Sequence, residues 1–234
     1  MCTVSIVPVF HGCRVVCNRD ERRTRAAAHP PRVLPTEVSW ATYPRDPESG
    51  GTWIGVNDDG LVAALLNRTG TQNQSRVSPP SRGSIVPALL SCASIAQAMN
   101  LYDTLDVSRF EPFRIVLAHR SIVAVLTGNR TNNPAELFRL VRPVMFTSSS
   151  LGDAIVEPPR RRLFEQLVLG GDDWLHGQFQ FHRHRWAKRP EVSVHMSRQG
   201  AATVSRTTID VTSKNVDLQY ESLVAPASIR RPAA

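Results

Sequence analysis

The chain has 234 residues, of which 41% are hydrophobic and 21% are charged. This composition is typical of a folded protein with one substantial core, and it excludes wholesale disorder. No apolar run approaches the ~18–20 residues that a membrane-spanning helix needs, so no membrane span is expected. The N-terminus lacks a basic stretch followed by an apolar segment, so we also expect no secretory signal and a cytoplasmic location.

The net charge of +8 comes mainly from arginine, since only Lys188 and Lys214 among the 28 basic residues are lysine. Two basic clusters, at 160–162 and 182–189, raise the question of nucleic-acid binding. The second interleaves aromatic and basic side chains, as single-strand binders do. No recognised nucleic-acid motif accompanies either cluster, so we interpret both as solvated helix faces and expect no nucleic-acid partner.

Four cysteines are present, Cys2, Cys13, Cys17 and Cys92. In a cytoplasmic protein we expect them to be reduced thiols that form no disulfide framework. Cys13 and Cys17 are four residues apart, but no second Cys or His pair follows at a zinc-like spacing. We therefore expect no metal site and no cofactor.

Runs of β-branched residues predict strands in the first third of the chain. His11-Gly12 is a turn signal, and Pro8 indicates an edge or a bulge in its strand. Asp58-Asp59-Gly60 is a second turn signal. In chain order, the expected elements are a hairpin over residues 3–18, a long polar loop over 22–51, a strand over 50–57, its return strand over 61–66 and a further loop over 67–82.

An apolar stripe at helical spacing predicts a helix over 83–100, with Ser84 as a candidate N-cap. The other expected elements are strands over 113–119 and 122–127, a short helix over 134–141, a strand over 144–147, helices over 159–169 and 173–186, strands over 191–196 and 202–211, and a frayed tail from residue 213. This order of strands, helices and strands predicts a single α+β domain over residues 1–234 with largely antiparallel sheets.

Cys2 directly follows the initiator methionine. Methionine aminopeptidase normally removes Met1 when the next side chain is small, and the mature chain would then begin with both a thiol and a free α-amino group. The thiolate is the nucleophilic form of cysteine, and an adjacent amine can take the thiol proton. The alternative is that Cys2 is a small core residue.

Several motifs occur in order along the first third of the chain. They are Met1-Cys2, Cys17-Asn18-Arg19-Asp20-Glu21, Gly50-Gly51-Thr52-Trp53-Ile54-Gly55, the run from Gly60 to Asn67, and Ser81-Arg82-Gly83. Together they closely resemble the NRDE family, also called the transport and Golgi organisation 2 family. That family is similar to the N-terminal-nucleophile (Ntn) hydrolases, which implies a four-layer αββα sandwich of antiparallel sheets. Within that superfamily the chain looks most like the choloylglycine hydrolase group of bile-salt and penicillin V amidases.

The resemblance implies a role for each matching residue. Cys2 matches the nucleophile, its amine the general base, Arg19 the arginine that holds the thiolate, Asn67 the oxyanion donor, and Arg198 a late active-site arginine. Either Asp20 or Glu21 matches the carboxylate that binds the amine, and we favour Asp20. Amidases of the group carry a second asparagine where this chain has Ser148-Ser149-Ser150. Ser149 and Trp53 are the candidate substrate-binding residues.

The resemblance implies two functions that remain open at this stage. The first is a cysteine amidohydrolase that cleaves linear, non-peptide C–N amide bonds in a small molecule. The alternative is a non-enzymatic binding or trafficking protein, since eukaryotic members are associated with secretory-pathway organisation and with lipid or haem handling. The sequence indicates neither the substrate nor the oligomeric state.

Overall fold

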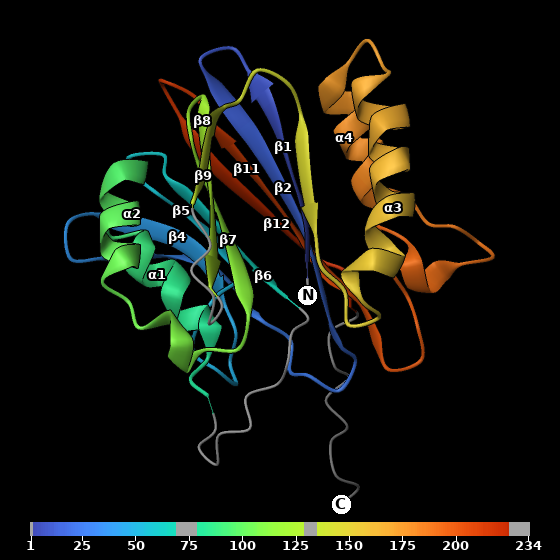
Figure 1. Cartoon of the computed structure of the whole chain (residues 1–234), viewed down its shortest axis with the longest axis horizontal. Helices are drawn as coiled ribbons and strands as arrows, with labels where there is room; N and C mark the ends of the chain where they lie inside the picture. The colour runs from blue at the N-terminus through green and yellow to red at the C-terminus, as the bar shows by residue number, and fades with distance from the viewer. Residues whose placement is uncertain (1, 69–78, 129–134, 225–234) are drawn as a thin grey trace, which may run out of the picture.

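Two antiparallel sheets lie face to face between two layers of helices in the computed structural model (Figure 1). The structure describes residues 2–68, 79–128 and 135–224. Helices α1 and α2 cover the outer face of one sheet, and α3 and α4 cover the outer face of the other (Figure 1). This is the αββα arrangement that the sequence predicts, so the predicted fold class is confirmed.

Sheet A has the strand order β10-β1-β2-β11-β12. Its strands are β1 (Cys2–Val9), β2 (Gly12–Arg22), β10 (Val144–Thr147), β11 (Ala201–Val211) and β12 (Val216–Ser222). The hairpin predicted over 3–18 is present as β1 and β2, which pair from Cys2↔Arg19 to Val9↔Gly12. On its other side β1 pairs with β10 only from Thr3 to Ile6, so Pro8 lies on a free edge, where its missing N–H is tolerated.

Sheet B has the strand order β3-β4-β5-β6-β7-β8-β9. Its strands are β3 (His29–Pro35), β4 (Trp40–Arg45), β5 (Ile54–Asn57), β6 (Val62–Asn67), β7 (Phe113–His119), β8 (Ile122–Gly128) and β9 (Glu136–Arg139). The predicted turn between β5 and β6 contains Gly60 at a φ of 83°, a left-handed conformation that favours glycine.

The main core fills the space between the sheets. It contains Cys2, Val4 and Ile6 from β1, together with apolar residues of β2, β6, β8 and β11. A second cluster lies between sheet B and helices α1 (Ile85–Leu89) and α2 (Ile95–Asp103). A third lies between sheet A and helices α3 (Asp153–Phe164) and α4 (Trp174–Arg183). Strand β1 is therefore buried on both faces, with Cys2, Val4 and Ile6 in the core between the sheets and Thr3, Ser5 and Val7 on the side of the helices.

Two predictions failed in the first half of the chain. The segment 22–51 is not one long loop, because β3 and β4 form a hairpin within it, closed by hydrogen bonds between Thr36 and Ser39. The helix predicted over 83–100 is divided into α1 and α2 after a short 3₁₀ turn, η1 (Arg82–Ser84). Ser94 interrupts it, because its side chain accepts from the N–H of Gln97 and caps a new helix.

Further predictions failed in the second half. The segment predicted as a helix over 134–141 contains β9, which pairs with the edge of β8. Residues 191–196 form no strand; a 3₁₀ turn, η4 (Pro190–Val192), lies there. The tail from 213 contains β12, whose partner β11 supplies backbone hydrogen bonds that a local pattern does not show. Helix α3 begins earlier than the predicted residue 159 and continues into a π-helical turn, η3 (Glu165–Leu169).

Among the described residues, no helix is both long and apolar enough to cross a bilayer.

Candidate active site

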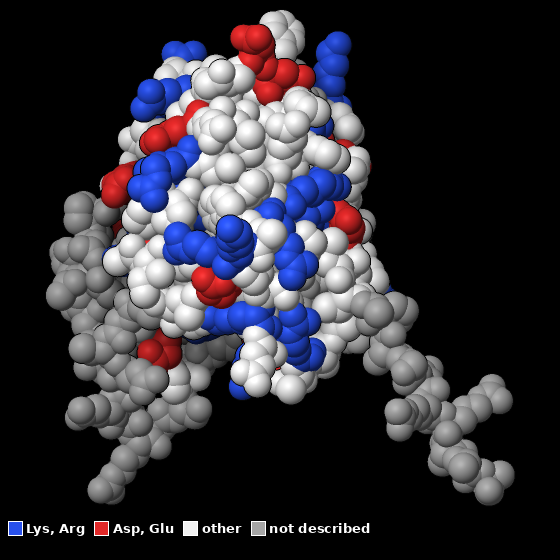
Figure 2. Space-filling view, turned by 90° about the vertical axis from the view of Figure 1, so that its right-hand side faces the viewer, with Lys and Arg blue, Asp and Glu red and all other residues white. Residues whose placement is uncertain are grey.

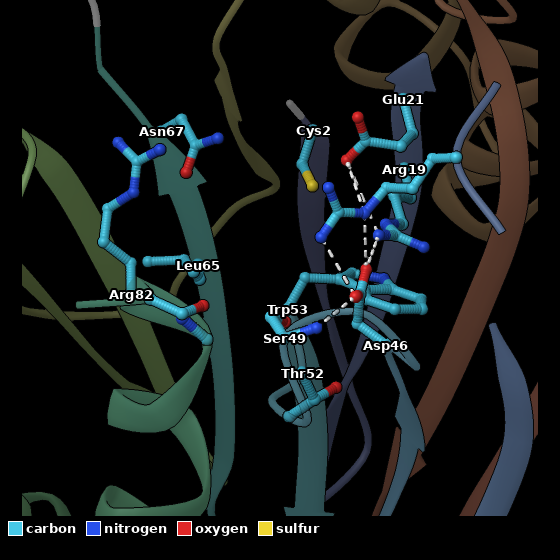
Figure 3. A pocket seen from close by; sticks show the side chains of 13 residues that line it. Cys2, Arg19, Glu21, Asp46, Ser49, Thr52, Trp53, Leu65, Asn67 and Arg82 are labelled. Atoms are coloured by element: carbon cyan, nitrogen blue, oxygen red, sulfur yellow. Dashed lines mark hydrogen bonds and ion pairs between the residues drawn. The ribbon is translucent and has the colours of Figure 1, made fainter. Parts of the chain in front are cut away.

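Cys2 lies at the start of β1, directly opposite Arg19 of β2. The two residues line a pocket of about 250 Å³ together with Trp53 and Asn67 (Figure 3). Cys2 and Arg19 come from sheet A, whereas Asn67 is the last residue of β6 in sheet B. The pocket therefore opens where the ends of the two sheets meet, and it brings together four of the residues that the sequence predicted for the site.

Arg19 is held by carboxylates and by an aromatic ring. Its Nη2 donates to Asp46 Oδ2 and lies 3.5 Å from Glu21 Oε2, and its guanidinium carbon lies 4.0 Å from the centre of the Trp53 ring. Arg25 also donates to both oxygens of Asp46, at 2.8 and 3.0 Å. These contacts fix the Arg19 guanidinium beside Cys2.

Asp46 is charged in this cluster despite its burial. Burial favours the neutral carboxyl, but hydrogen bonds from Arg25 and from the backbone N–H of Ser49, together with the charge of Arg19, hold the pKa of Asp46 well below its usual range. Asp46 therefore serves as the shared anion that orients two arginines at the pocket.

The thiol of Cys2 is buried, and its pKa lies below the ordinary value of a cysteine. Hydrogen bonding with the Cys17 thiol lowers the pKa of Cys2 most strongly, burial opposes this, and the positive charge of Arg19 lowers it further. The same interaction and burial raise the pKa of Cys17 well above its ordinary value. Cys17 therefore stays protonated and can donate to the sulfur of Cys2, which is the more nucleophilic of the two thiols.

The backbone nitrogen of Cys2 contacts the first residue of the serine triplet. Its N–H donates to Ser148 Oγ at 3.3 Å, and the Ser148 N–H donates to the carbonyl oxygen of Cys2 at 3.0 Å. Ser148 follows β10, the strand next to β1, so this contact results from the order of sheet A. If Met1 is removed, this nitrogen is the α-amine of the chain.

Asp20 and Glu21 point to opposite faces of β2, because successive side chains of a strand alternate. Glu21 lines the pocket beside Arg19 (Figure 3). Asp20 is buried on the other face, where it accepts from Thr203 Oγ1 at 2.6 Å and lies 3.7 Å from Arg160. Burial raises the pKa of Asp20, and Arg160 and Thr203 oppose that rise. Asp20 is also close enough to raise the pKa of Cys2.

Like Asp20, two further predicted residues, Ser149 and Arg198, lie outside the pocket. The guanidinium of Arg198 donates to Ser150 Oγ, and its charge lowers the pKa of Asp20. The Ser149 N–H donates to Asp153 Oδ1 at 2.9 Å, and its hydroxyl accepts from the N–H of Leu151, so Ser149 forms the turn that leads into α3. Neither residue lines the pocket, and their roles remain predictions.

Three charged residues of the pocket were not predicted from the sequence. Asp46 and Arg25 belong to the segment 22–51, which the sequence predicts to be one loop, and no local pattern marks them. Arg82 lies in the Ser81-Arg82-Gly83 motif, to which the family resemblance assigns no role. The sequence offered one signal for Arg82 as a site residue: it lies in a family motif and outside any predicted strand.

The two basic clusters are partly buried. Arg160 and His182 are 0% exposed, since Arg160 donates to Thr3, Thr147 and two backbone carbonyls, and His182 contacts Ser5 and Asn18. On the face formed by α3 and α4, basic side chains appear in several groups with acidic and uncharged surface between them (Figure 2). Part of each cluster therefore supports the packing of helices on sheet A, in contrast to the fully solvated faces that the sequence predicts.

Comparison with solved structures identifies similar folds. The Caenorhabditis elegans ortholog of N-acylethanolamine-hydrolyzing acid amidase has a TM-score of 0.57 and 12% identity, over 88% of this chain and 92% of that chain. Penicillin V acylase from Agrobacterium tumefaciens has a TM-score of 0.54 and 10% identity, over 95% and 86%. The C2A mutant of conjugated bile acid hydrolase from Clostridium perfringens has a TM-score of 0.52 and 10% identity, over 95% and 92%. At these identities the likeness concerns the fold, which is that of the Ntn hydrolases.

No curated protein matches the sequence. The family model described as "Transport and Golgi organisation 2" matches residues 14–171, more than half of the chain. This span includes Arg19, Trp53 and Asn67 of the pocket, and it agrees with the motifs found in the sequence. The chain therefore belongs to the transport and Golgi organisation 2 family.

Proposed function

We propose that this chain is an N-terminal-nucleophile hydrolase that uses Cys2 to cleave linear, non-peptide amide bonds in a small molecule. One observation carries the proposal: Cys2, at the second position of the chain, lines a pocket with Arg19 beside it and Asn67 on the facing wall. The similar solved structures support it, because they are named as an amidase, an acylase and a hydrolase.

The reaction begins once removal of Met1 has freed the α-amine of Cys2. The amine takes the thiol proton, and the sulfur attacks the amide carbonyl carbon. The protonated amine then gives its proton to the leaving nitrogen, so the C–N bond breaks and a thioester remains. In the second half, the amine takes a proton from water, the hydroxyl attacks the thioester, and the acid and the free thiol are released.

Each neighbouring residue has a proposed part in these steps. Arg19 favours the thiolate, and the Asn67 side-chain amide donates to the oxyanion that forms in both halves of the reaction. The α-amine is oriented by Ser148 and by the Asp20 carboxylate, with Arg198 acting on the Asp20 side. Trp53 forms the wall beneath Arg19. Contact of Ser149 with substrate requires a change in the turn that it now forms.

A comparison of Cys2→Ala with Cys13→Ala tests the proposal. Both side chains are buried thiols of sheet A, but only Cys2 lines the pocket. The Cys2→Ala protein is expected to fold and to lose all reaction with acyl electrophiles such as an activated ester, whereas Cys13→Ala should still react. Reaction of Cys2→Ala at the wild-type rate would contradict the proposal and favour the non-enzymatic alternative. A haem titration, followed by the Soret band, and a lipid-binding assay would then examine that alternative.

A further inference from the structure

Arg82 extends from the wall of the pocket opposite to Cys2. Figure 3 shows Arg82 and Asn67 on the side of β6 and η1, with Cys2 and Arg19 across from them on the side of β1 and β2. Neither the proposed chemistry nor the residues matched through the family resemblance gives Arg82 a role. Its position nevertheless lets it contact any substrate that reaches Cys2.

The backbone around Arg82 is fixed against the strand before Trp53. The Thr52 N–H donates to the carbonyl oxygen of Gly83 at 3.0 Å, and Ser81 Oγ accepts from the Gly83 N–H at 3.3 Å. A Cβ added at Gly51 would lie 2.4 Å from the carbonyl carbon of Gly83, so only glycine permits this approach. The base of the Arg82 side chain is therefore held in place by the two glycine motifs.

The guanidinium of Arg82 differs from the other two in the pocket. Arg19 and Arg25 both pair with Asp46, whereas no carboxylate of residues 2–68, 79–128 or 135–224 lies within 4.0 Å of Arg82. Its Nη1 donates to the carbonyl oxygen of Pro112 at 2.9 Å. The remaining segments of the chain contain no Asp or Glu that could supply a carboxylate side chain.

The charge of Arg82 is also only partly hydrated. Burial lowers the pKa of Arg82, and Glu111 opposes this through its charge. A half-buried guanidinium, most of whose N–H groups have no partner among the described residues, is a favourable partner for a planar or tetrahedral anion, which it can bind through two parallel hydrogen bonds.

We propose that Arg82 binds an anionic group of the substrate, a carboxylate or a phosphate, while the scissile carbonyl lies at Cys2. This inference rests on the proposed function, because it takes the molecule bound in the pocket to be the substrate of Cys2. The pocket, at about 250 Å³, is small for a ligand site, so the anionic group and the amide lie close together in one compact molecule. Arg82 thereby selects acidic amides over neutral ones.

Two alkylating reagents of nearly equal size test this charge selectivity. Iodoacetate is an anion and iodoacetamide is neutral, and both modify a thiol by the same displacement of iodide. The rate of Cys2 modification by each reagent is measured by peptide mapping in the wild type, Arg82→Gln, Arg82→Lys and Arg139→Gln. Each rate is divided by the rate at which the same reagent modifies glutathione, which removes the difference in intrinsic reactivity between the two reagents.

Arg139→Gln is the matched control because it removes an exposed arginine from the other end of sheet B. Arg139 pairs with Ile122, whereas Asn67 lies at the end of the sheet marked by Phe113 and Gly128. Thermal unfolding of each variant checks that the fold is retained, and Arg82→Lys preserves the charge if Arg82→Gln does not fold.

The ratio of the iodoacetate rate to the iodoacetamide rate is expected to fall about twofold to fivefold in Arg82→Gln, the size of one partly hydrated charge interaction. It should be largely kept in Arg82→Lys and unchanged in Arg139→Gln. An equal ratio in the wild type and Arg82→Gln, with Cys2 reactive in both, would overturn the inference and leave the proposed function standing. Failure of Cys2 to react with either reagent would instead contradict the proposed function.

Protection experiments distinguish the two kinds of anion. Glutarate, inorganic phosphate and neutral glutaramide are each added before iodoacetamide. Protection of Cys2 by glutarate or by phosphate, absent in Arg82→Gln, supports the proposal and identifies a carboxylate or a phosphate as the preferred group. Equal protection by glutaramide and both anions would contradict it.

Discussion

The backbone nitrogen of Cys2 donates to the hydroxyl oxygen of Ser148, 146 residues further along the chain, at 3.3 Å. Under the proposed function this nitrogen is the general base once Met1 has been removed, and Ser148 is in a position to orient its lone pair toward the thiol. The first serine of the triplet therefore lies at this nitrogen, whereas the sequence prediction had selected Ser149.

Replacement of Ser148 by alanine tests this orientation. We expect Ser148→Ala to fold and to acylate Cys2 about threefold to tenfold more slowly, the effect of one lost hydrogen bond. Ser205→Ala is the matched control, because Ser205 is also a buried serine, it lies in β11 of the same sheet that Ser148 follows, and its hydroxyl has no hydrogen-bond partner among the described residues. Equal acylation rates in the two variants would show that Ser148 does not position the amine.

Cys17 is expected to set the pH at which Cys2 becomes reactive. Because hydrogen bonding with Cys17 lowers the pKa of Cys2, Cys17→Ala should raise that pKa. The rate of iodoacetamide modification at Cys2, measured against pH, should then rise at higher pH than in the wild type. Cys13→Ala removes another thiol of β2, one whose pKa burial raises to about 12, and it should leave the profile unchanged. A profile that stays in place in Cys17→Ala would contradict the role of this thiol.

Asp46 contributes stability that depends on pH. Its folded pKa lies below the ordinary value of 3.8, so the carboxylate stabilises the fold above that pH and loses its contribution as pH falls below it. Asp46→Asn should lower the free energy of unfolding by about 3 kcal/mol at neutral pH, since it leaves two arginines without their shared anion. Urea unfolding at pH 7 and pH 3 should show that this difference shrinks in acid.

Glu48→Gln is the control for Asp46. Glu48 contacts Arg25 at 3.2 Å but is 45% exposed, so its loss should cost less than about 1 kcal/mol. A pH-independent loss in Asp46→Asn would indicate a packing effect rather than the loss of a charge.

Asn67 should affect acyl transfer but not simple alkylation. Acyl transfer develops an oxyanion that the Asn67 side chain can stabilise, and the loss of one such donor costs about 10²–10³-fold in rate. Displacement of iodide from iodoacetamide forms no oxyanion at the attacked carbon. Asn67→Ala should therefore acylate Cys2 far more slowly while iodoacetamide modifies it at a nearly unchanged rate. If both reactions slowed equally, Asn67 would be needed for the shape of the pocket and not for stabilising the oxyanion.

The sequence predicted the central part of the fold well. The hairpin of β1 and β2 has alternating β-branched residues and a His11-Gly12 turn, and both signals are local. The prediction failed at β3, β9 and β12, which are short or lie at sheet edges and depend on a partner strand. Pairing with a strand from another part of the chain decides whether such a segment becomes a strand. A pattern within ten residues contains no information about that partner.

The site residues were likewise predicted where a local motif marks them and missed where only the fold brings them together. Cys2, Arg19, Trp53 and Asn67 were found because motifs mark them, and they meet at one pocket. Asp46 was missed because its role depends on the approach of Arg19 and Arg25 from other segments. Asp20 and Glu21 could be assigned to different faces of β2 only once the strand and its partners were known.

The most direct test of a catalytic Cys2 is the intact mass of the purified protein before and after a small dose of iodoacetamide, with peptide mapping. We expect a mass without Met1 and alkylation of Cys2 ahead of Cys13, Cys17 and Cys92. Retention of Met1, with Cys2 no more reactive than the other three thiols, would contradict it, because the nucleophile would then lack its base.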